Sequence, residues 1–566
     1  MKNTLIPFRL LLVAFMSTSL LAGTPASSQT QEWLQTFNGS ANQYDEATTM
    51  AVDNAGNVYI AGVTNDEYAY GTKGVMLLAK YNAAGVFQWS QTVAGQGQNA
   101  IVNAIAIDGN NEIIITGTSG ISPSGWIEPG DYYTVKFDAN GQLLWTQIYN
   151  GPSNGHDEVR SIAVDAANNI YITGSSNQPN SFYNDIATVM YSAAGIQQWV
   201  HQYNGPGNGD DFGAKAVFKN GFLYVTGASR GTSNWDILTI KYNPANGSVV
   251  WTARYDDSGN YSEYAVDMAV DGNDNVYVAG VVYTKGKKVV QSETNANWVL
   301  LKYNTSGSQQ WVKTYDGSAD DNYFYNTTIF YNDYPTALAL DNAGNIFVTG
   351  RTYNKAGSGK NVTNSLDMTT VKYNPAGTQL WVKDYDGPSK AEDCANAIST
   401  DGAGNVYITG KSFTTGQGMN AATVKYNGLG VQQWVTTYNS GGSNMDEAKA
   451  IKVDGNGKVY VAGKAGADAF VVKYGQPVGS FRLTAQTEKS QNLLAYPNPV
   501  KDWLIIKNIN ENPIGQVLLF DPIGRKVFEQ NISESNTRIN LQDLPVGIYY
   551  LRIEHQNEVV KIQKEK

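Results

Sequence analysis

The stretch AVDNAGNVYIAG (residues 51–62) combines a short apolar strand, a turn rich in Asp, Asn and Gly, and a β-branched strand that ends in glycine. Asn and Gly accept the positive φ angles of tight hairpin turns, so the stretch predicts a β-hairpin. Seven further copies follow, beginning at residues 106, 163, 217, 269, 339, 399 and 452. A pattern that recurs at such intervals predicts a fold in which similar units stack and bury a shared core between them.

A second hairpin follows each of the first seven copies, as in TVKFDANGQLLW (134–145), and its last strand carries a tryptophan. The eighth copy begins as FVVKYGQPVG (470–479) and lacks this Trp strand. QEWLQTF (31–37) has the missing pattern. Four strands per repeat predict an all-β fold, an eight-bladed β-propeller that the N-terminal strand closes.

The recurring tryptophans are predicted to lie on the outer strands, where they cover the gaps between blades. They are Trp33, Trp89, Trp145, Trp199, Trp251, Trp311, Trp381 and Trp434. Stacking against a cofactor is the alternative role, but outer strands face away from the central channel. We therefore expect no cofactor at these rings.

Composition excludes several classes of protein. Asp and Glu outnumber Lys and Arg by 50 to 40, which disfavours a nucleic-acid groove. The single cysteine rules out an intrachain disulfide and disfavours a Cys-based metal site. Three histidines leave little material for zinc or Ser–His–Asp hydrolase chemistry.

Residues 1–28 have Lys2 and Arg9, an apolar core and then small residues, which predicts a secretory signal peptide. The apolar run is shorter than a membrane-spanning helix needs, so no transmembrane anchor is expected in the mature chain. The propeller is predicted to span residues 29–475, followed by a linker at 476–492. Alternating apolar strands and Pro/Gly turns in residues 493–566 predict a small Ig-like β-sandwich.

Acidic pairs precede the first strand of most repeats and are predicted to ring the mouth of the channel. The candidate metal ligands are Asp45 and Glu46, Asp157 and Glu158, and Asp446 and Glu447. Clustered carboxylates suit a hard cation such as Ca²⁺. The competing interpretation, which we favour, is that each carboxylate accepts hydrogen bonds from its own loop backbone.

Aromatic residues in the loops that vary between repeats are the candidate ligand-binding residues. They are Trp126, Trp235 and Trp298, with Tyr323, Phe324 and Tyr325 in an insertion of the sixth repeat. Aromatic rings beside Asn and Asp on a rigid scaffold suit recognition of a glycan or a protein. The alternative is that these rings only cover the tops of the blades.

No catalytic residue is assigned. A glycosidase needs two carboxylates at a defined separation, and the many loop Asp and Glu residues leave that reaction open. We favour a non-catalytic binding scaffold. The alternatives are a polysaccharide-active enzyme that uses carboxylates at the channel mouth and a structural component of a cell surface or matrix.

The repeats resemble the SBBP-type β-propeller family, and residues 493–566 resemble the type A C-terminal sorting domain of the type IX secretion system. The residues that carry the second resemblance are Tyr496, Pro497, Asn498, Pro499, Gly547, Tyr549, Lys561 and Lys564. The resemblance implies an outer-membrane translocon as partner and removal of the domain after export. It also implies release or attachment at the cell surface. An independent ligand-binding sandwich is the alternative for this module.

Overall fold

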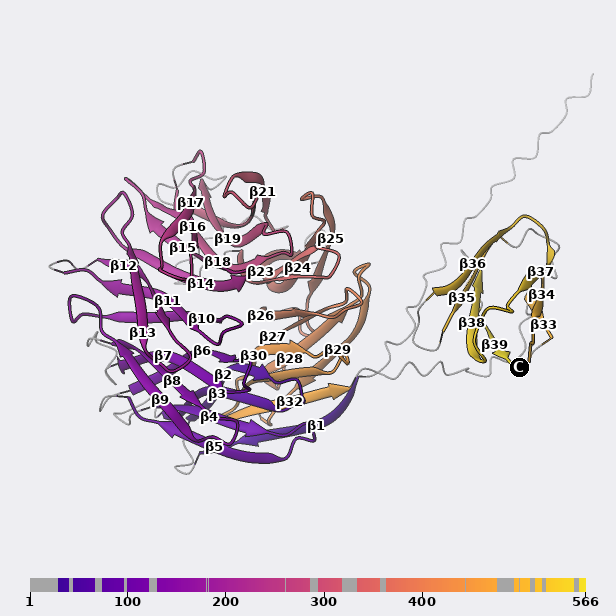
Figure 1. The fold of residues 1–566 in the computed structure, drawn as a ribbon, viewed down its shortest axis with the longest axis horizontal. Helices are drawn as coiled ribbons and strands as arrows, with labels where there is room; N and C mark the ends of the chain where they lie inside the picture. The colour runs from indigo at the N-terminus through magenta and orange to yellow at the C-terminus, as the bar shows by residue number, and fades with distance from the viewer. Residues whose placement is uncertain are drawn as a thin grey trace, which may run out of the picture. The chain divides into compact units, whose positions relative to one another are not determined.

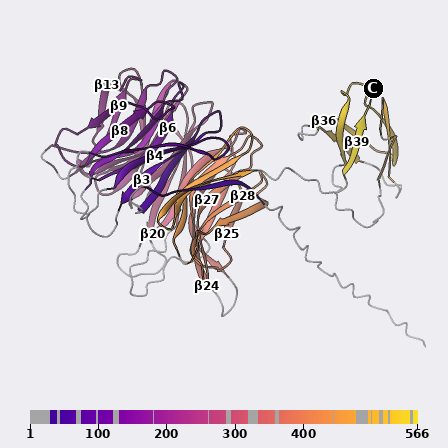
Figure 2. The same cartoon turned by 90° about the horizontal axis from the view of Figure 1, so that it is seen from below.

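The computed structural model describes residues 29–39, 44–66, 74–95, 99–121, 130–179, 181, 183–259, 261–285, 294–317, 333–356, 363–442, 444–475, 493–497, 499–508, 515–521, 526–553 and 559–565. The chain divides into two compact units, residues 1–478 and 479–566, which are described separately (Figures 1 and 2). The predicted signal peptide and the predicted linker lie outside the described residues.

The first unit is built from four-stranded antiparallel sheets arranged like the blades of a propeller (Figure 1). Sheet 1 contains β2 (Tyr44–Val52), β3 (Val58–Asp66), β4 (Val75–Tyr81) and β5 (Phe87–Val93), and sheet 2 contains β6 (Asn99–Ile107), β7 (Ile113–Ile121), β8 (Asp131–Phe137) and β9 (Leu143–Tyr149). Sheet 3 contains β10 (Asp157–Val164), β11 (Ile170–Asn177), β12 (Asn184–Tyr191) and β13 (Gln197–Tyr203). Sheet 4 contains β14 (Asp211–Lys219), β15 (Phe222–Arg230), β16 (Trp235–Tyr242) and β17 (Val249–Tyr255).

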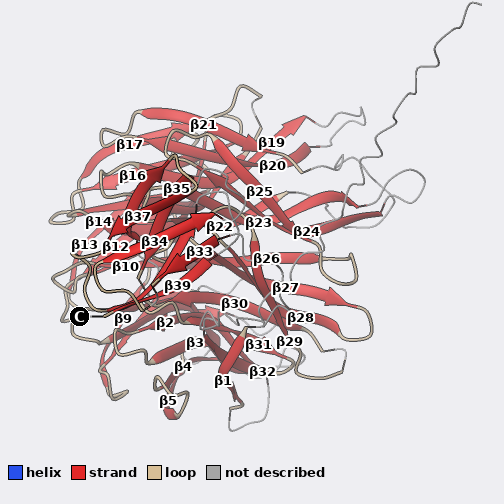
Figure 3. Cartoon of the chain, turned by 90° about the vertical axis from the view of Figure 1, so that its right-hand side faces the viewer, coloured by secondary structure: helices blue, strands red, loops and turns tan. Residues whose placement is uncertain are grey.

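Sheets 5 to 8 repeat this order. Sheet 5 contains β18 (Glu263–Val270), β19 (Val276–Lys285), β20 (Thr294–Tyr303) and β21 (Gln309–Tyr315), and sheet 6 contains β22 (Tyr334–Leu340), β23 (Ile346–Ala356), β24 (Thr363–Tyr373) and β25 (Gln379–Tyr385). Sheet 7 contains β26 (Asp393–Thr400), β27 (Val406–Thr414), β28 (Gly418–Tyr426) and β29 (Gln432–Tyr438). Sheet 8 contains β30 (Asp446–Val453), β31 (Val459–Ala465), β32 (Asp468–Gly475) and β1 (Thr30–Phe37). The first and last strands of each sheet, in this order, are called its inner and outer strands. Among the described residues the secondary structure is strand alone, without a helix (Figure 3).

The outer strand of sheet 8 comes from the beginning of the chain. β1 pairs antiparallel with β32, and Trp33 lies opposite Lys473. Each inner strand contacts the inner strand of the next sheet, and β30 contacts β2. Segments from the two ends of the unit therefore share one sheet.

The turn in the first repeat (residues 51–62) is stabilised by hydrogen bonds to its aspartate, Asp53. Asp53 Oδ1 accepts the backbone N–H groups of Ala55 (2.9 Å) and Asn57 (2.8 Å). Its Oδ2 accepts the Asn57 side-chain amide (2.7 Å) and the Tyr59 hydroxyl (3.3 Å). The same pattern recurs at Asp165, Asp271 and Asp401. This network explains why Asp, Asn and Tyr recur at fixed spacing in the repeat.

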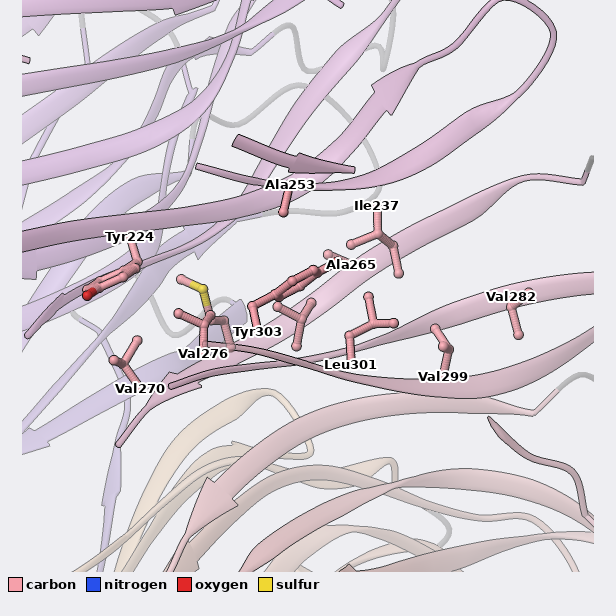
Figure 4. Close-up of a cluster of buried hydrophobic side chains, with 12 residues drawn as sticks. Tyr224, Ile237, Ala253, Ala265, Val270, Val276, Val282, Val299, Leu301 and Tyr303 are labelled. Atoms are coloured by element: carbon pink, nitrogen blue, oxygen red, sulfur yellow. The ribbon is translucent and has the colours of Figure 1, made fainter. Parts of the chain in front are cut away.

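Apolar side chains fill the space between neighbouring sheets. In the cluster of Figure 4, Tyr224 and Ile237 of sheet 4 pack against Ala265, Val276 and Leu301 of sheet 5. Burial of each large apolar side chain contributes about 1.5–3 kcal/mol. Stability of this unit therefore depends on contact between sheets and not on any sheet alone.

Outer-strand tryptophans connect each sheet to the next, as predicted. Trp145 Nε1 donates to the carbonyl of Ala193 (3.1 Å), in the turn before the outer strand of sheet 3. The ring covers Gly195, whose φ is +81° and where a Cβ atom would lie 2.7 Å from the indole. Indoles with equivalent carbonyl partners are Trp33, Trp199, Trp251, Trp311 and Trp381.

The second unit is a small pair of sheets. One contains β33 (Leu493–Tyr496), β34 (Trp503–Asn508) and β37 (Asn536–Asn540), and the other contains β36 (Lys526–Ile532), β35 (Gly515–Phe520), β38 (Gly547–Ile553) and β39 (Val559–Lys564). Their shared core includes Leu504, Ile506, Leu519, Ile539 and Leu551. No helix long and apolar enough to cross a bilayer occurs in the part of the chain that the structure describes.

We expect Trp145→Ala to lower the free energy of unfolding by about 2–4 kcal/mol, because it removes an indole that packs on the next sheet. Chemical denaturation followed by circular dichroism measures the change. Leu144→Ala is the matched control, since the Leu144 side chain is exposed on the same strand. Equal effects of the two substitutions would contradict a bridging role for the tryptophan.

Candidate functional site

A buried carboxylate marks the start of nearly every inner strand. At the junction of sheets 3 and 4, Asp211 Oδ2 accepts the backbone N–H of Gly205 (2.6 Å) and Oδ1 accepts that of Arg230 (2.8 Å). Gly205 follows the outer strand of sheet 3, and Arg230 ends the second strand of sheet 4. Asp211 therefore fastens two loops from neighbouring sheets. We call this arrangement the carboxylate clasp.

The clasp recurs around the unit. Its residues are Asp45, Asp157, Asp211, Asp333, Asp393 and Asp446, with Glu263 at the equivalent position of sheet 5 and Ala100 at that of sheet 2. Each of these side chains is fully buried. Asp333 was missed by the sequence analysis because the insertion in the sixth repeat separates it from the pair Asp320–Asp321, which lies outside the described residues.

The structure places three of the predicted metal ligands in clasps. Asp446 accepts backbone N–H groups from Ser440 (2.7 Å) and Gly466 (2.8 Å). Asp45 and Asp157 accept equivalent amides from Gly39 and Gly151. These carboxylates thus accept hydrogen bonds from loop backbone N–H groups, which is the role that the sequence analysis favoured over metal binding. A metal role for the six predicted residues stays a prediction.

The residue after each clasp is partly exposed at the inner edge of its sheet, and these positions form a rim. In sheet order they are Glu46, Ile101, Glu158, Phe212, Tyr264, Tyr334, Cys394 and Glu447. Cys394 is the exception to exposure, at 5%. From sheet 8 to sheet 3, three of the four rim residues are glutamates, and we call this part the ionic half. From sheet 4 to sheet 6 all three rim residues are aromatic, and we call this part the aromatic half; Cys394 of sheet 7 lies between the two.

Ion pairs organise the ionic half. Lys449 Nζ lies 2.8 Å from Glu447 and 3.7 Å from Glu46, so one lysine links the inner strands of sheets 8 and 1. Asn396 donates its side-chain amide to Glu447 (2.9 Å). Burial raises the pKa of Glu447, but Lys449 and Asn396 outweigh it and the net pKa is lowered. Arg160 pairs with Glu158 at 2.8 Å.

A connected group of aromatic rings makes up most of the other half. The ring centroids of Trp235 and Tyr264 are 5.6 Å apart, and those of Tyr264 and Tyr283 are 6.0 Å apart in an edge-on arrangement. The hydroxyls of Tyr283 and Tyr334 are 2.5 Å apart. We call these four residues the aromatic cluster. All four side chains are partly exposed.

Two arginines border the aromatic cluster. The Arg230 guanidinium lies 4.5 Å from the Trp235 ring centroid, and that of Arg351 lies 5.1 Å from the Tyr334 centroid. Such cation–π contacts help to orient the rings. The Trp235 indole also donates to the Asp210 carbonyl at 3.0 Å, which fixes its plane.

The predicted ligand-binding aromatics have different outcomes. Trp235 lies in the aromatic cluster. Trp298 was expected among exposed aromatics, but it is only 3% exposed and packs in the core against Tyr315, because its strand position faces the neighbouring sheet. The remaining candidates, Trp126, Tyr323, Phe324 and Tyr325, lie outside the described residues. Sequence reasoning missed Tyr264, Arg230 and Arg351. A signal was present for Tyr264, which is an aromatic residue directly after the clasp position.

A polar cleft of about 640 Å³ lies at the opposite end of the inner strands from the clasps. It runs between the Asp271 and Asp341 turns and is bordered by Lys219 and Lys302. The two aspartates already accept hydrogen bonds within their own turns. The cleft therefore offers mainly backbone and amide groups to a ligand.

Residues of the predicted sorting motif meet in the second unit. Val500 donates its N–H to the Gln563 carbonyl (2.7 Å), and its own carbonyl accepts the N–H of Glu565 (2.8 Å). Gly547 lies opposite Lys564 in the paired strands β38 and β39. The hydroxyl of Tyr549 donates to the Pro545 carbonyl (2.7 Å).

The other motif residues lie close by along the chain. Tyr496 is 43% exposed and Pro499 is also exposed, whereas Lys564 is buried. Tyr496 and Pro497 are joined by a cis peptide bond. Lys561 lies opposite Tyr550 in the β38–β39 pair, and Asn498 lies outside the described residues. The start, the middle and the end of this module therefore contact one another.

Asp157→Ala should lower the free energy of unfolding by about 2–4 kcal/mol, because the backbone N–H groups of Gly151 and Asn177 lose their buried acceptor. Urea denaturation measures the change. Glu158→Ala, which removes only a partly exposed ion pair with Arg160, should change it by about 1 kcal/mol or less. A larger effect at Glu158 than at Asp157 would contradict the clasp assignment.

Burial raises the pKa of Asp185 to about 6 from its ordinary value of 3.8, with the nearby Asp211 carboxylate adding to the shift and a hydrogen bond from Gln178 opposing it. A raised folded-state pKa stabilises the fold below about pH 4, and that contribution is lost as the pH rises through 6. We expect Tm of the wild type to fall between pH 4 and pH 7 relative to that of Asp185→Asn, measured by thermal unfolding. If the Tm values of the wild type and of Asp185→Asn changed with pH in the same way, the raised pKa of Asp185 would be refuted.

Family models match parts of the chain. The β-propeller repeat model matches residues 33–69, 144–183 and 327–355, and the secretion system C-terminal sorting domain model matches residues 494–565. No curated protein matches the sequence.

Several solved structures are similar at low identity. PorZ, an essential bacterial surface component of the type-IX secretion system of Porphyromonas gingivalis, is 12% identical with a TM-score of 0.36, over 94% of this chain and 60% of PorZ. Sqt1 of Chaetomium thermophilum is 10% identical with a TM-score of 0.46, over 80% and 99% of the two chains. The β-propeller domain of the Trilobed protease from Pyrococcus furiosus is 10% identical with a TM-score of 0.36, over 66% and 93%.

This chain thus spans 60% of the length of PorZ. Together, the repeat sheets and the two family models show that the chain contains SBBP-type β-propeller repeats and a secretion system C-terminal sorting domain at residues 494–565.

Proposed function

We propose that this protein is exported by the type IX secretion system and binds a glycan, without catalysis, at the rim of a closed eight-bladed propeller. The observation that carries the proposal is the aromatic cluster of Trp235, Tyr264, Tyr283 and Tyr334, which lies on the rim beside an arc of carboxylates. The sorting domain supports secretion or attachment at the cell surface.

The two halves of the rim suit the two kinds of surface on a sugar. Sugar rings carry apolar C–H faces, which pack on partly exposed aromatic rings, and hydroxyl groups, which need fixed hydrogen-bond partners. Trp235 and Tyr264 supply the first kind of surface. Glu46, Glu158 and Glu447 supply acceptors whose positions are already set by Lys449 and Arg160.

Binding is favoured over hydrolysis by the electrostatics of the ionic half. A glycosidase needs one carboxyl group that keeps its proton near neutral pH, which requires a raised pKa. The pKa of Glu447 is lowered, and Lys449 holds its charged form. Asp333, whose pKa burial raises to about 6, is fully buried in a clasp and out of reach of a polysaccharide.

The sheet contacts support closure of the ring. β1 completes the sheet of β30 to β32, and Trp33 of β1 donates to the Ala83 carbonyl in sheet 1. A chain that closes in this way leaves no exposed sheet edge between its first and last repeats. We further propose that residues 1–28 are removed as a signal peptide and that residues 493–566, an Ig-like sandwich, are removed after export by the translocon.

A glycan array tests the binding proposal with the purified full chain. We expect specific binding, and we expect Trp235→Ala to weaken it at least about tenfold because stacking on the indole is lost. Tyr183→Ala is the matched control: Tyr183 is 50% exposed, belongs to a loop between strands, and is not part of the aromatic cluster.

Three outcomes would overturn the proposal. Equal loss of binding in the two variants would show that the cluster is not the site. Degradation of a bound polysaccharide would establish the enzyme alternative. Capture of a protein ligand with no glycan bound would assign the rim to protein recognition.

A further inference from the structure

Each junction between sheets brings three chain positions together. The first is a recurring position near the start of the third strand, which is polar in most sheets. The second is the residue that follows the outer strand, and the third is the clasp residue of the next sheet. At four junctions the middle position is an asparagine: Asn38, Asn150, Asn204 and Asn439. At the junction of sheets 1 and 2 the positions hold Val75, Ala94 and Ala100. Most junctions therefore carry at most two acids.

Two junctions carry three acids each. Between sheets 4 and 5 they are Asp236, Asp256 and Glu263, and between sheets 6 and 7 they are Asp367, Asp386 and Asp393. Within each group, one carboxylate oxygen per residue lies within 4.8 Å of the others. Three carboxylates so close repel one another strongly unless protons or a positive charge offset them.

The first group contains its own positive charge. Arg254 donates to Asp236 Oδ2 through Nε (2.8 Å) and forms an ion pair with the same oxygen through Nη2 (2.7 Å). Arg254 is the residue before Tyr255, the tyrosine that ends the outer strand of sheet 4. In sheet 6 the equivalent residue is Asp384, a fourth acid in place of the arginine.

The second group has no such partner. Among the described residues, no Lys or Arg forms an ion pair with Asp367, Asp386 or Asp393; the exposed Lys390 interacts with Asp386 only at longer range. Asp393 is fully buried, and its Oδ2 accepts the Gly387 N–H at 2.6 Å. The buried Oδ1 of Asp386 accepts no hydrogen bond. The buried Ser412 side chain lies opposite Asp393 on the paired strand and is hydrogen-bonded to it.

We infer that Asp367, Asp386 and Asp393 bind a divalent cation, with Ca²⁺ as the best fit. Ca²⁺ takes oxygen ligands at 2.3–2.6 Å, so two ligands of one ion lie at most about 5 Å apart, which agrees with the spacing of this group. The unpaired Oδ1 of Asp386 and the Ser412 hydroxyl oxygen beside Asp393 supply further coordination sites. The ion would join the outer strand of sheet 6 to the inner strand of sheet 7.

Calorimetric titration of the purified full chain with CaCl₂, after chelation and at constant ionic strength, tests the inference. We expect one Ca²⁺ per chain and a Tm increase of at least about 2 °C at saturation. Asp386→Asn introduces the residue found at four other junctions, and Asp384→Arg introduces the arginine of sheet 4. Each should weaken Ca²⁺ binding at least tenfold.

Asp256→Asn is the matched control, because it makes the same change in the group that already contains Arg254. It should leave Ca²⁺ affinity unchanged. The inference is overturned if the wild type does not bind Ca²⁺ at several millimolar, if Asp386→Asn and Asp384→Arg bind it as the wild type does, or if Asp256→Asn abolishes binding. The titration of the wild type decides the question even if one variant fails to fold.

Discussion

The carboxylate clasp is the interaction on which the rest of this structure depends. A buried ionised group is unfavourable unless charged or hydrogen-bonded partners offset its desolvation. Here backbone N–H groups from two different loops offset part of that cost, as at Asp211 with Gly205 and Arg230, where burial still raises the pKa of the carboxyl group. Because one loop belongs to the preceding sheet, the clasp fixes neighbouring sheets relative to each other. It also fixes the residue that follows it, and those residues make up the rim.

Small changes at the clasp give different junctions different chemistry. Ala100 replaces the carboxylate beside sheet 2, where the surrounding positions are apolar as well. Glu263 has one more methylene group than Asp, and its pKa is raised to about 9, chiefly by burial, with nearby acidic residues adding to the shift. Specific properties of this protein arise where the repeats differ, on a frame that their common residues maintain.

The sequence contains enough information for the fold because each signal is local. The Asp53 turn, the glycine under each tryptophan and the four-strand repeat all depend on residues close together in the chain. The pairing of β1 with β32 spans 440 positions, yet the Trp pattern of QEWLQTF indicates it, since the last repeat lacks that strand. Asp333 escaped prediction because an insertion changed its spacing from the repeat.

The candidate site was harder to predict because it depends on which side of a strand each residue faces. Trp235 begins the third strand of sheet 4, whereas Trp298 lies inside the third strand of sheet 5, so one reaches the rim and the other faces the core. The aromatic cluster joins residues from sheets 4, 5 and 6, and no sequence spacing reports a contact between three sheets. Likewise, Asp384 is an unremarkable outer-strand acid until the arginine at its equivalent in sheet 4 shows that this position controls the charge of a junction.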